Sequence, residues 1–180
     1  MFNIMNLIST PAIKIMMLLC KNPMKEYYQR EISNLCGVSV GATNQVMKKL
    51  FQVEFVTQEK KGKMYFYKAN LKNPLVKQFK IFMNISYIFP LIRELREYSR
   101  IIILFGSCSN GTDVEESDID LLIIATGKTY VRKKVAGFNK KSERKISPII
   151  IDMNEFVKLR KEDKALYRNI KKGIVVWEKE

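Results

Sequence analysis

Two acidic residues interrupt a run of aliphatic side chains near the middle of the chain. Asp118 and Asp120 occur in the segment Ser117–Ile124, whose remaining residues are mostly Ile and Leu. A second aliphatic segment, Arg100–Phe105, precedes it and ends at a Gly-Ser pair. Continuously apolar runs of this length are typical of strands that are buried on both faces of a sheet. Because side chains two residues apart on a strand share a face, both carboxylates are expected to point the same way.

Two carboxylates at the end of an apolar strand are costly to bury unless a cation neutralises them. Oxygen ligands without a nearby histidine or thiolate favour Mg²⁺, which also binds substrate phosphates. Gly106 has no side chain to keep a phosphate away from the backbone. Ser107 offers a hydroxyl and a backbone N–H at the expected start of a helix. The pattern therefore predicts a site for Mg²⁺ and a phosphorylated ligand.

The Gly-Ser pair, ten further residues and Asp-Ile-Asp inside a second apolar strand resemble the signature of the DNA polymerase beta-type nucleotidyltransferase superfamily. The short length resembles the minimal (MNT) branch, over roughly residues 85–180. The resemblance implies Mg²⁺-dependent transfer of a nucleoside monophosphate from an NTP to a protein, nucleic-acid or small-molecule hydroxyl, with release of pyrophosphate. Gly106 and Ser107 would hold the β- and γ-phosphates, and Asp118 and Asp120 would ligate two Mg²⁺ ions.

The superfamily carries a third carboxylate on a later strand, where it helps to activate the acceptor hydroxyl. The resemblance makes Asp152, which follows the apolar segment Ile149–Ile151, the candidate for this catalytic and metal-binding role. Asp152 also fits a helix N-cap, with Glu155 at the third helical position as in a capping box. As a ligand Asp152 would complete a transferase, whereas as a cap it would leave a domain that binds Mg–NTP without transferring anything.

The first third of the chain has a different pattern, in which short amphipathic stretches precede two alternating segments. The expected elements are a helix that begins at Thr10-Pro11, helices over 28–36 and 39–50, and strands over 51–59 and 64–69. Gly37 suits the left-handed residue of a tight turn between the second and third helices. This order resembles the winged helix-turn-helix domains of prokaryotic transcription regulators, over residues 10–70.

The second resemblance implies a DNA-binding mechanism. The third helix would enter the major groove of double-stranded DNA, where its outward polar side chains would meet base edges or phosphates. Lysines of the turn between the strands, the wing, would contact backbone phosphates. The candidate DNA-binding residues are Ser39, Thr43, Asn44, Gln45, Lys48, Lys60, Lys61 and Lys63. The same residues are also consistent with a capped, solvated helix and a solvated turn.

Together the patterns predict an α+β protein with two domains. We expect a winged helix-turn-helix domain over 1–72, a connecting helix over 73–87 and a nucleotidyltransferase α/β domain with a mixed sheet over 88–180. The boundary lies near Asn73-Pro74, because the residue before a proline is disfavoured in the α region. A further helix is expected around Pro90–Glu97, with the proline near its first turn.

Composition limits the classes of function and of partner. Thirty-two Lys and Arg against eighteen Asp and Glu give a net charge of +14, which favours polyanionic partners. The absence of histidine excludes Ser-His-Asp and Cys-His catalysis and His-ligated zinc. Three cysteines without CxxC spacing favour reduced thiols and a cytoplasmic protein. No segment is expected to reach the length of a membrane span, so no membrane partner is expected.

Two other functions fit the same pattern. In the first, the chain is a transcriptional regulator whose transferase-like domain only binds nucleotide or dimerises. The apolar segment 75–86 is consistent with such a homodimer and equally with packing between domains. In the second, the chain is an antitoxin-type nucleotidyltransferase paired with a small toxin, as some members of the minimal branch are.

Overall fold

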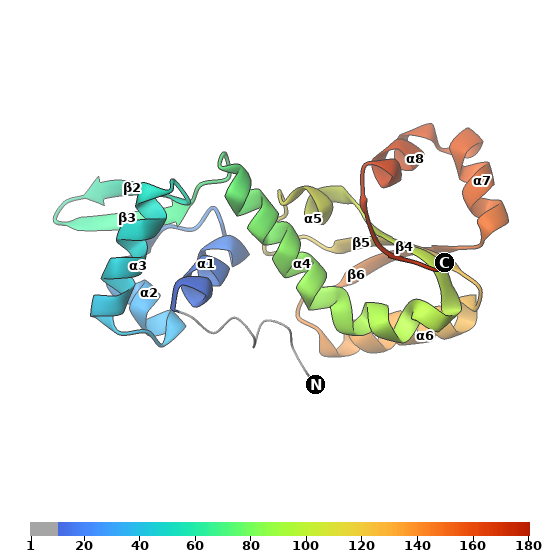
Figure 1. The fold of residues 1–180 in the computed structure, drawn as a ribbon, viewed down its shortest axis with the longest axis horizontal. Coiled ribbons are helices and arrows are strands. Elements are labelled where there is room, and N and C mark those ends of the chain that lie inside the picture. Colours follow the sequence, from blue (N-terminus) through green and yellow to red (C-terminus); the bar gives the residue numbers. More distant parts are fainter. Residues whose placement is uncertain (1–10) are drawn as a thin grey trace. The chain divides into compact units, whose positions relative to one another are not determined.

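The computed structural model describes residues 11–180, and the chain divides between Lys80 and Ile81 into two compact units (Figure 1). The expected N-cap of the first helix, Thr10, lies outside the described residues.

Three helices and a three-stranded antiparallel sheet make up the first unit. Its elements are α1 (Pro11–Lys21), β1 (Tyr27–Tyr28), α2 (Gln29–Cys36), α3 (Val40–Gln52), β2 (Val56–Lys61) and β3 (Met64–Ala69). The strand order is β1-β3-β2. The interior contains one apolar stripe from each helix, including Ile15, Leu19, Ile32, Met47 and Leu50. The three expected helices are therefore confirmed within the described residues.

The turn between α2 and α3 forms as its sequence indicates. Gly37 has a φ of 60°, and its N–H donates to carbonyls at the end of α2. The strand expected over 51–59 is wrong in its first half, because α3 continues to Gln52 and β2 begins at Val56. Phe51 and Val53 are exposed while Phe55 is buried. Alternation over so few residues does not distinguish a helix end from a strand.

The helix α4 runs without interruption from Pro74 to Leu95 and contains Pro90. The expectation of a separate helix with Pro90 in its first turn is therefore wrong. Proline removes one helical hydrogen bond, but the buried side chains of Ile88, Leu91 and Ile92 hold the helix together around it. By length and composition alone, Pro74–Tyr98 is apolar enough to cross a membrane, contrary to the expectation from sequence. Within its most apolar stretch, 39% is buried inside the structure.

A mixed sheet forms the centre of the second unit, as expected for the α+β class. After a short 3₁₀ helix, η2 (Arg96–Tyr98), the strands are β4 (Ser99–Leu104), β5 (Ile119–Ala125), β6 (Ile146–Ile151) and β7 (Ile174–Glu178), in the order β6-β5-β4-β7. β5 and β6 are parallel, whereas β4 is antiparallel to β5 and β7. The helices are α5 (Gly106–Asn110), α6 (Lys128–Lys141), α7 (Met153–Glu162) and α8 (Lys164–Lys171).

Helices cover both faces of this sheet (Figure 1). One core cluster joins α4 and α6 to side chains such as Ile102 and Leu121. The other joins α7 and α8 to side chains such as Ile103 and Leu122. This burial on both faces confirms the interpretation of the two apolar segments. Asp163 ends α7 and caps α8, so this C-terminal helical segment consists of two short helices.

Candidate functional site

The Gly-Ser pair and the Asp-Ile-Asp segment contact each other where β4 ends and β5 begins. The N–H of Phe105 donates to the carbonyl of Asp120 at 3.1 Å. Gly106 follows with a φ of +70°, and a β-carbon at this position would overlap Oδ2 of Asp120. Only glycine avoids both the strained backbone and the overlap. The backbone of Gly106 therefore lies directly against the Asp120 carboxylate.

The two aspartates share this edge but differ in exposure. Asp118 is exposed and precedes β5, while Asp120 is half-buried as the second residue of the strand. Burial raises the pKa of Asp120, and the neighbouring Asp118 carboxylate raises it further. A cation bound between these carboxylates would offset both effects. The pair therefore fits a site for a divalent cation.

Ser107 is the second residue of α5, a helix of only five residues. It is half-buried, and its carbonyl accepts a hydrogen bond from the N–H of Thr112 at 3.1 Å. The hydroxyl of Ser109 donates to the carbonyl of Gly106 at 2.8 Å, which fixes the first turn. Cys108 is buried, and burial raises the pKa of its thiol to about 11. A thiol with this pKa is protonated at neutral pH, so Cys108 is unsuited to nucleophilic catalysis.

Asp152 does not belong to this edge of the sheet. The parallel register of β5 and β6 pairs Asp120 with Ser147 and Ile124 with Ile151. Asp152 is five residues beyond Ser147, or about 16 Å along the sheet at ~3.3 Å per residue. Among residues 11–180, no group of three Cys, Asp or Glu side chains could hold a metal ion. The prediction that Asp152 ligates metal together with Asp118 and Asp120 is therefore wrong.

Asp152 is instead the N-cap of α7. Its side chain accepts from the N–H of Glu155 at 3.0 Å, and the Glu155 side chain accepts from the N–H of Asp152 at 2.7 Å. Both carboxylates also pair with the ammonium of Lys128, at 2.7 and 2.6 Å. This ion pairing and the capping bond lower the pKa of Asp152. The capping-box interpretation is confirmed.

A model of the family described as polymerase beta, nucleotidyltransferase, matches residues 91–180. The chain belongs to this family. The matched segment begins within α4 and includes the Gly-Ser pair, both aspartates and every strand of the mixed sheet. Comparison with curated proteins and comparison with solved structures each found no match. The family points to nucleotidyl transfer in general.

The nucleotidyltransferase unit presents two carboxylates at this edge. Ser147, the residue paired with Asp120 across β5 and β6, is exposed and carries a hydroxyl. β6 contains no acidic residue. Two carboxylates and substrate phosphates form a suitable donor set for one Mg²⁺ ion. A second ion, as in a two-metal scheme, would lack the third carboxylate that the resemblance implies.

In the first unit the predicted DNA-binding residues of α3 divide between exposed and buried positions. Asn44, Gln45 and Lys48 are exposed on one side of α3. Ser39 is exposed as well, and its hydroxyl accepts from the N–H of Ala42 at 3.3 Å as an N-cap. Thr43 is fully buried. The prediction that Thr43 contacts DNA is wrong, because its position one turn from Met47 places it on the inner face.

The three wing lysines are all exposed, but one of them is engaged within the unit. The ammonium of Lys61 donates to the carboxylate of Glu26, lies 3.8 Å from that of Glu59, and sits over the ring of Phe66. These carboxylates raise the pKa of Lys61. Lys60 and Lys63 extend from the turn without an ion pair among the described residues. They are the better candidates for phosphate contacts.

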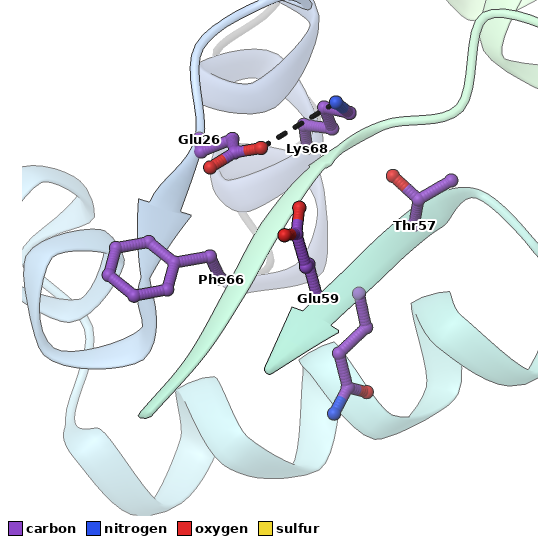
Figure 2. Close-up of a pocket in the computed structure, with 6 residues that line it drawn as sticks. Glu26, Thr57, Glu59, Phe66 and Lys68 are labelled. Atoms are coloured by element: carbon purple, nitrogen blue, oxygen red, sulfur yellow. Dashed lines mark ion pairs between the residues drawn. The ribbon is translucent and has the colours of Figure 1, made fainter. Parts of the chain in front are cut away.

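A hollow of about 310 Å³ lies on the outer face of the three-stranded sheet of the first unit (Figure 2). It is lined by Glu26, Thr57, Gln58, Glu59, Phe66 and Lys68. Figure 2 shows Glu26 paired with Lys68, at 3.6 Å. Glu26 has no local signal in the sequence, because its lysine partners come from the hairpin more than thirty residues away. Its pKa is lowered chiefly by its hydrogen bond with Lys61.

Proposed function

We propose that the second unit binds a nucleoside triphosphate with Mg²⁺ and transfers its nucleoside monophosphate to a hydroxyl, releasing pyrophosphate. The residues proposed to hold the nucleotide and the ion are Gly106, Ser107, Asp118 and Asp120. The close contact between the Gly106 backbone and the Asp120 carboxylate is the observation that supports this assignment most directly. It brings a side-chain-free backbone, suited to phosphate, next to a carboxylate pair suited to Mg²⁺.

Different residues of the unit would bind the phosphate groups and the metal ion. Mg²⁺ would supply charge neutralisation and polarisation of the phosphate when bound. Asp118 and Asp120 would hold the ion, and its charge would favour the ionised form of Asp120 against the burial that disfavours it. Gly106 would let phosphate oxygens approach its backbone, because it has no side chain, and Ser107 would contribute a hydroxyl. With no acidic residue on β6, the acceptor hydroxyl would be deprotonated by Asp118, Asp120 or water.

The direct test is transfer of label from NTPs carrying ³²P at the α-phosphate. The full chain would be incubated with each NTP, Mg²⁺ and lysate from the source cells. Label on a macromolecule that disappears in Asp120→Ala supports the proposal. The matched control is Glu116→Ala, an exposed acidic residue in the loop before β5, and it should retain transfer. Label that persists in Asp120→Ala, or is absent with the wild-type protein, contradicts transfer at this site.

The labelling result also separates the alternative functions. Label that accumulates on a small protein partner would favour the antitoxin-type role. Nucleotide binding without transfer would favour a regulator whose second unit only binds nucleotide or dimerises. The two outcomes are distinguishable on a denaturing gel combined with an equilibrium binding measurement.

We propose as a second function that the first unit is a winged helix-turn-helix module that binds double-stranded DNA. The order of three helices followed by a hairpin, with β1 paired to β3, supports this proposal. So do the exposed polar side chains of α3 and the exposed Lys60 and Lys63. The test is selection from a pool of random duplexes at a stated salt concentration. Enrichment of one sequence supports the module, and equal binding of all duplexes contradicts sequence-selective recognition.

A further inference from the structure

A buried polar cluster in the second unit connects four segments that are distant in sequence. Asn84 in α4, Cys108 in α5 and Asp113 in the loop before β5 are each at most 4% exposed. The side chain of Arg144, in the connection between α6 and β6, is 19% exposed. Buried polar groups are retained where hydrogen bonds satisfy them, and this cluster is almost completely bonded.

Arg144 is the centre of the cluster. Its guanidinium donates to Oδ1 of Asn84 at 2.8 Å and to Sγ of Cys108 at 3.1 Å. It also donates to the carbonyl of Ser117, at 3.1 Å from Nη2 and 3.4 Å from Nε. Nη2 lies 3.3 Å from Oδ2 of Asp113, which forms a buried ion pair. The planar fork of arginine makes these contacts at the same time, which an ammonium group cannot do.

Three further hydrogen bonds complete the cluster and tie it to α4. The side-chain amide of Asn84 donates to Oδ1 of Asp113 at 3.0 Å and to the carbonyl of Cys108 at 3.1 Å. The hydroxyl of Tyr87 accepts from the N–H of Arg144 at 3.2 Å. Hydrogen bonds therefore hold Arg144 both at its backbone N–H and at its guanidinium group.

The two segments that Arg144 joins are those that carry the candidate site. Cys108 directly follows Ser107, and Ser117 directly precedes Asp118. Cys108 also donates from Sγ to the carbonyl of Asp118 at 3.5 Å. Ten residues separate Ser107 from Asp118, and this cluster joins their neighbours in addition to the direct hydrogen bond between Phe105 and Asp120. A displaced guanidinium would let the phosphate-binding and metal-binding groups move apart.

We propose that Arg144 is a positioning residue that holds the Ser107 and Asp118 segments at the separation needed to bind a divalent cation and phosphate together. This inference rests on the proposed function and deepens it. Arg144 itself contacts neither ion nor nucleotide. A purely structural role would make its loss destabilise the unit without a specific effect on ion affinity.

The first test is a titration of the full chain with Mn²⁺, in which electron paramagnetic resonance measures the free and bound ion. Asp120→Asn defines the fraction of bound Mn²⁺ that belongs to the site. Arg144→Lys keeps the positive charge but loses the fork, and we expect its Mn²⁺ affinity to fall about tenfold. The control is Val131→Ala, which removes buried methyl groups from α6 and should destabilise the fold while leaving affinity within about twofold.

The second test is hydrogen exchange, which needs no metal. The N–H of Thr112 donates to the carbonyl of Ser107 in α5, and the N–H groups of Val114 and Ser117 are bonded within the loop before β5. In Arg144→Lys these amides should exchange at least about tenfold faster, corresponding to local opening, while amides of β4 keep their wild-type rates. In Val131→Ala the loop amides should change no more than those of β4.

The outcomes separate this inference from the proposed function. Weaker Mn²⁺ binding and faster loop exchange in Arg144→Lys, with neither in the control, support positioning. Unchanged Mn²⁺ affinity, or an equal loss in Val131→Ala, overturns it while the metal site itself stands. Failure of the wild-type protein to bind Mn²⁺ in a manner that depends on Asp120 overturns both the proposed metal site and the positioning role.

Discussion

The backbone of Gly106 packs against the carboxylate of Asp120 so closely that a β-carbon at position 106 would overlap Oδ2. This contact joins the end of one buried strand to the start of the next. It leaves no room for a side chain at position 106, so the Gly106 backbone itself faces the Asp120 carboxylate. The contact also makes position 106 the most sensitive place to test the proposed site.

Gly106→Ala should abolish Mg²⁺-dependent nucleotide binding and destabilise the second unit. The positive φ costs about 1–2 kcal/mol for a residue with a β-carbon, and the overlap displaces Asp120. Gly137→Ala is the matched control, since this helical glycine has open space around it and the change should stabilise the fold by about 0.5–1 kcal/mol. Urea unfolding and isothermal titration with Mg–ATP measure both effects. Normal ATP binding in Gly106→Ala would contradict the assignment.

The ionised Asp120 side chain should lower the free energy of unfolding at neutral pH in the absence of metal. Its pKa is raised by burial and by Asp118, so the folded state binds the proton more tightly than the unfolded chain. The resulting stabilisation is complete below the ordinary value of 3.8 and is lost as the pH rises through the folded pKa. Asp120→Asn should therefore unfold at higher urea concentration than wild type at pH 7, and the difference should shrink toward pH 3.5. A difference independent of pH would argue against this electrostatic origin.

Removal of the α7 cap should affect stability and leave the metal site unchanged. Asp152→Ala loses the capping box and the ion pair with Lys128, so the thermal unfolding midpoint should fall. Asp163→Ala, which removes the cap of α8, should behave in the same way. Mn²⁺ affinity should equal that of wild type in both variants. A selective loss of Mn²⁺ binding in Asp152→Ala would restore Asp152 as a ligand.

Ser147→Asp should add a third carboxylate to the candidate site. Ser147 pairs with Asp120 across two parallel strands, so the new side chain would share its face. We expect several-fold tighter Mn²⁺ binding and, without metal, lower stability because three carboxylates repel one another. Thr126→Asp adds the same charge beyond the opposite end of β5 and should leave Mn²⁺ affinity unchanged. Equal effects of the two substitutions would show that net charge alone is responsible.

The wing lysines should contribute unequally to DNA binding. Lys60→Gln and Lys63→Gln should each reduce the slope of log affinity against log salt by about 1. Lys61→Gln should change it less, because Glu26 already engages its ammonium. Fluorescence anisotropy with one duplex at several salt concentrations gives the three slopes. Equal slopes for all three variants would indicate that the Glu26 pair opens on binding.

Local patterns were sufficient wherever neighbouring residues determine the outcome. The two apolar segments became strands buried on both faces, Gly37 adopted the left-handed turn, and Asp152 with Glu155 formed the capping box. The residues that fix these features lie within a few positions of one another. Their hydrogen bonds and steric preferences therefore act in almost any tertiary context.

Features that depend on pairing between distant segments were misjudged or missed. Asp152 adjoins an apolar strand, as Asp118 and Asp120 do. The parallel register of β5 and β6 nevertheless places Asp152 at the opposite end of these strands from Asp120. Thr43 was predicted to be an outward polar residue of its helix, but packing of the first unit buries its side chain. Arg144 was not among the predicted site residues, because its partners Asn84 and Ser117 lie 60 and 27 positions away in the sequence.

The sequence by itself determined the class of elements, their order, and the chemistry of the Gly-Ser and Asp-Ile-Asp segments. Tertiary structure decided which carboxylates share an edge and which cation, Arg144, bonds to both segments. The reason is physical: strand register across the α6 crossover and the burial of Arg144 depend on packing between residues up to sixty positions apart. Such packing is a property of the whole unit, whereas caps, turns and apolar periodicity arise from contiguous residues.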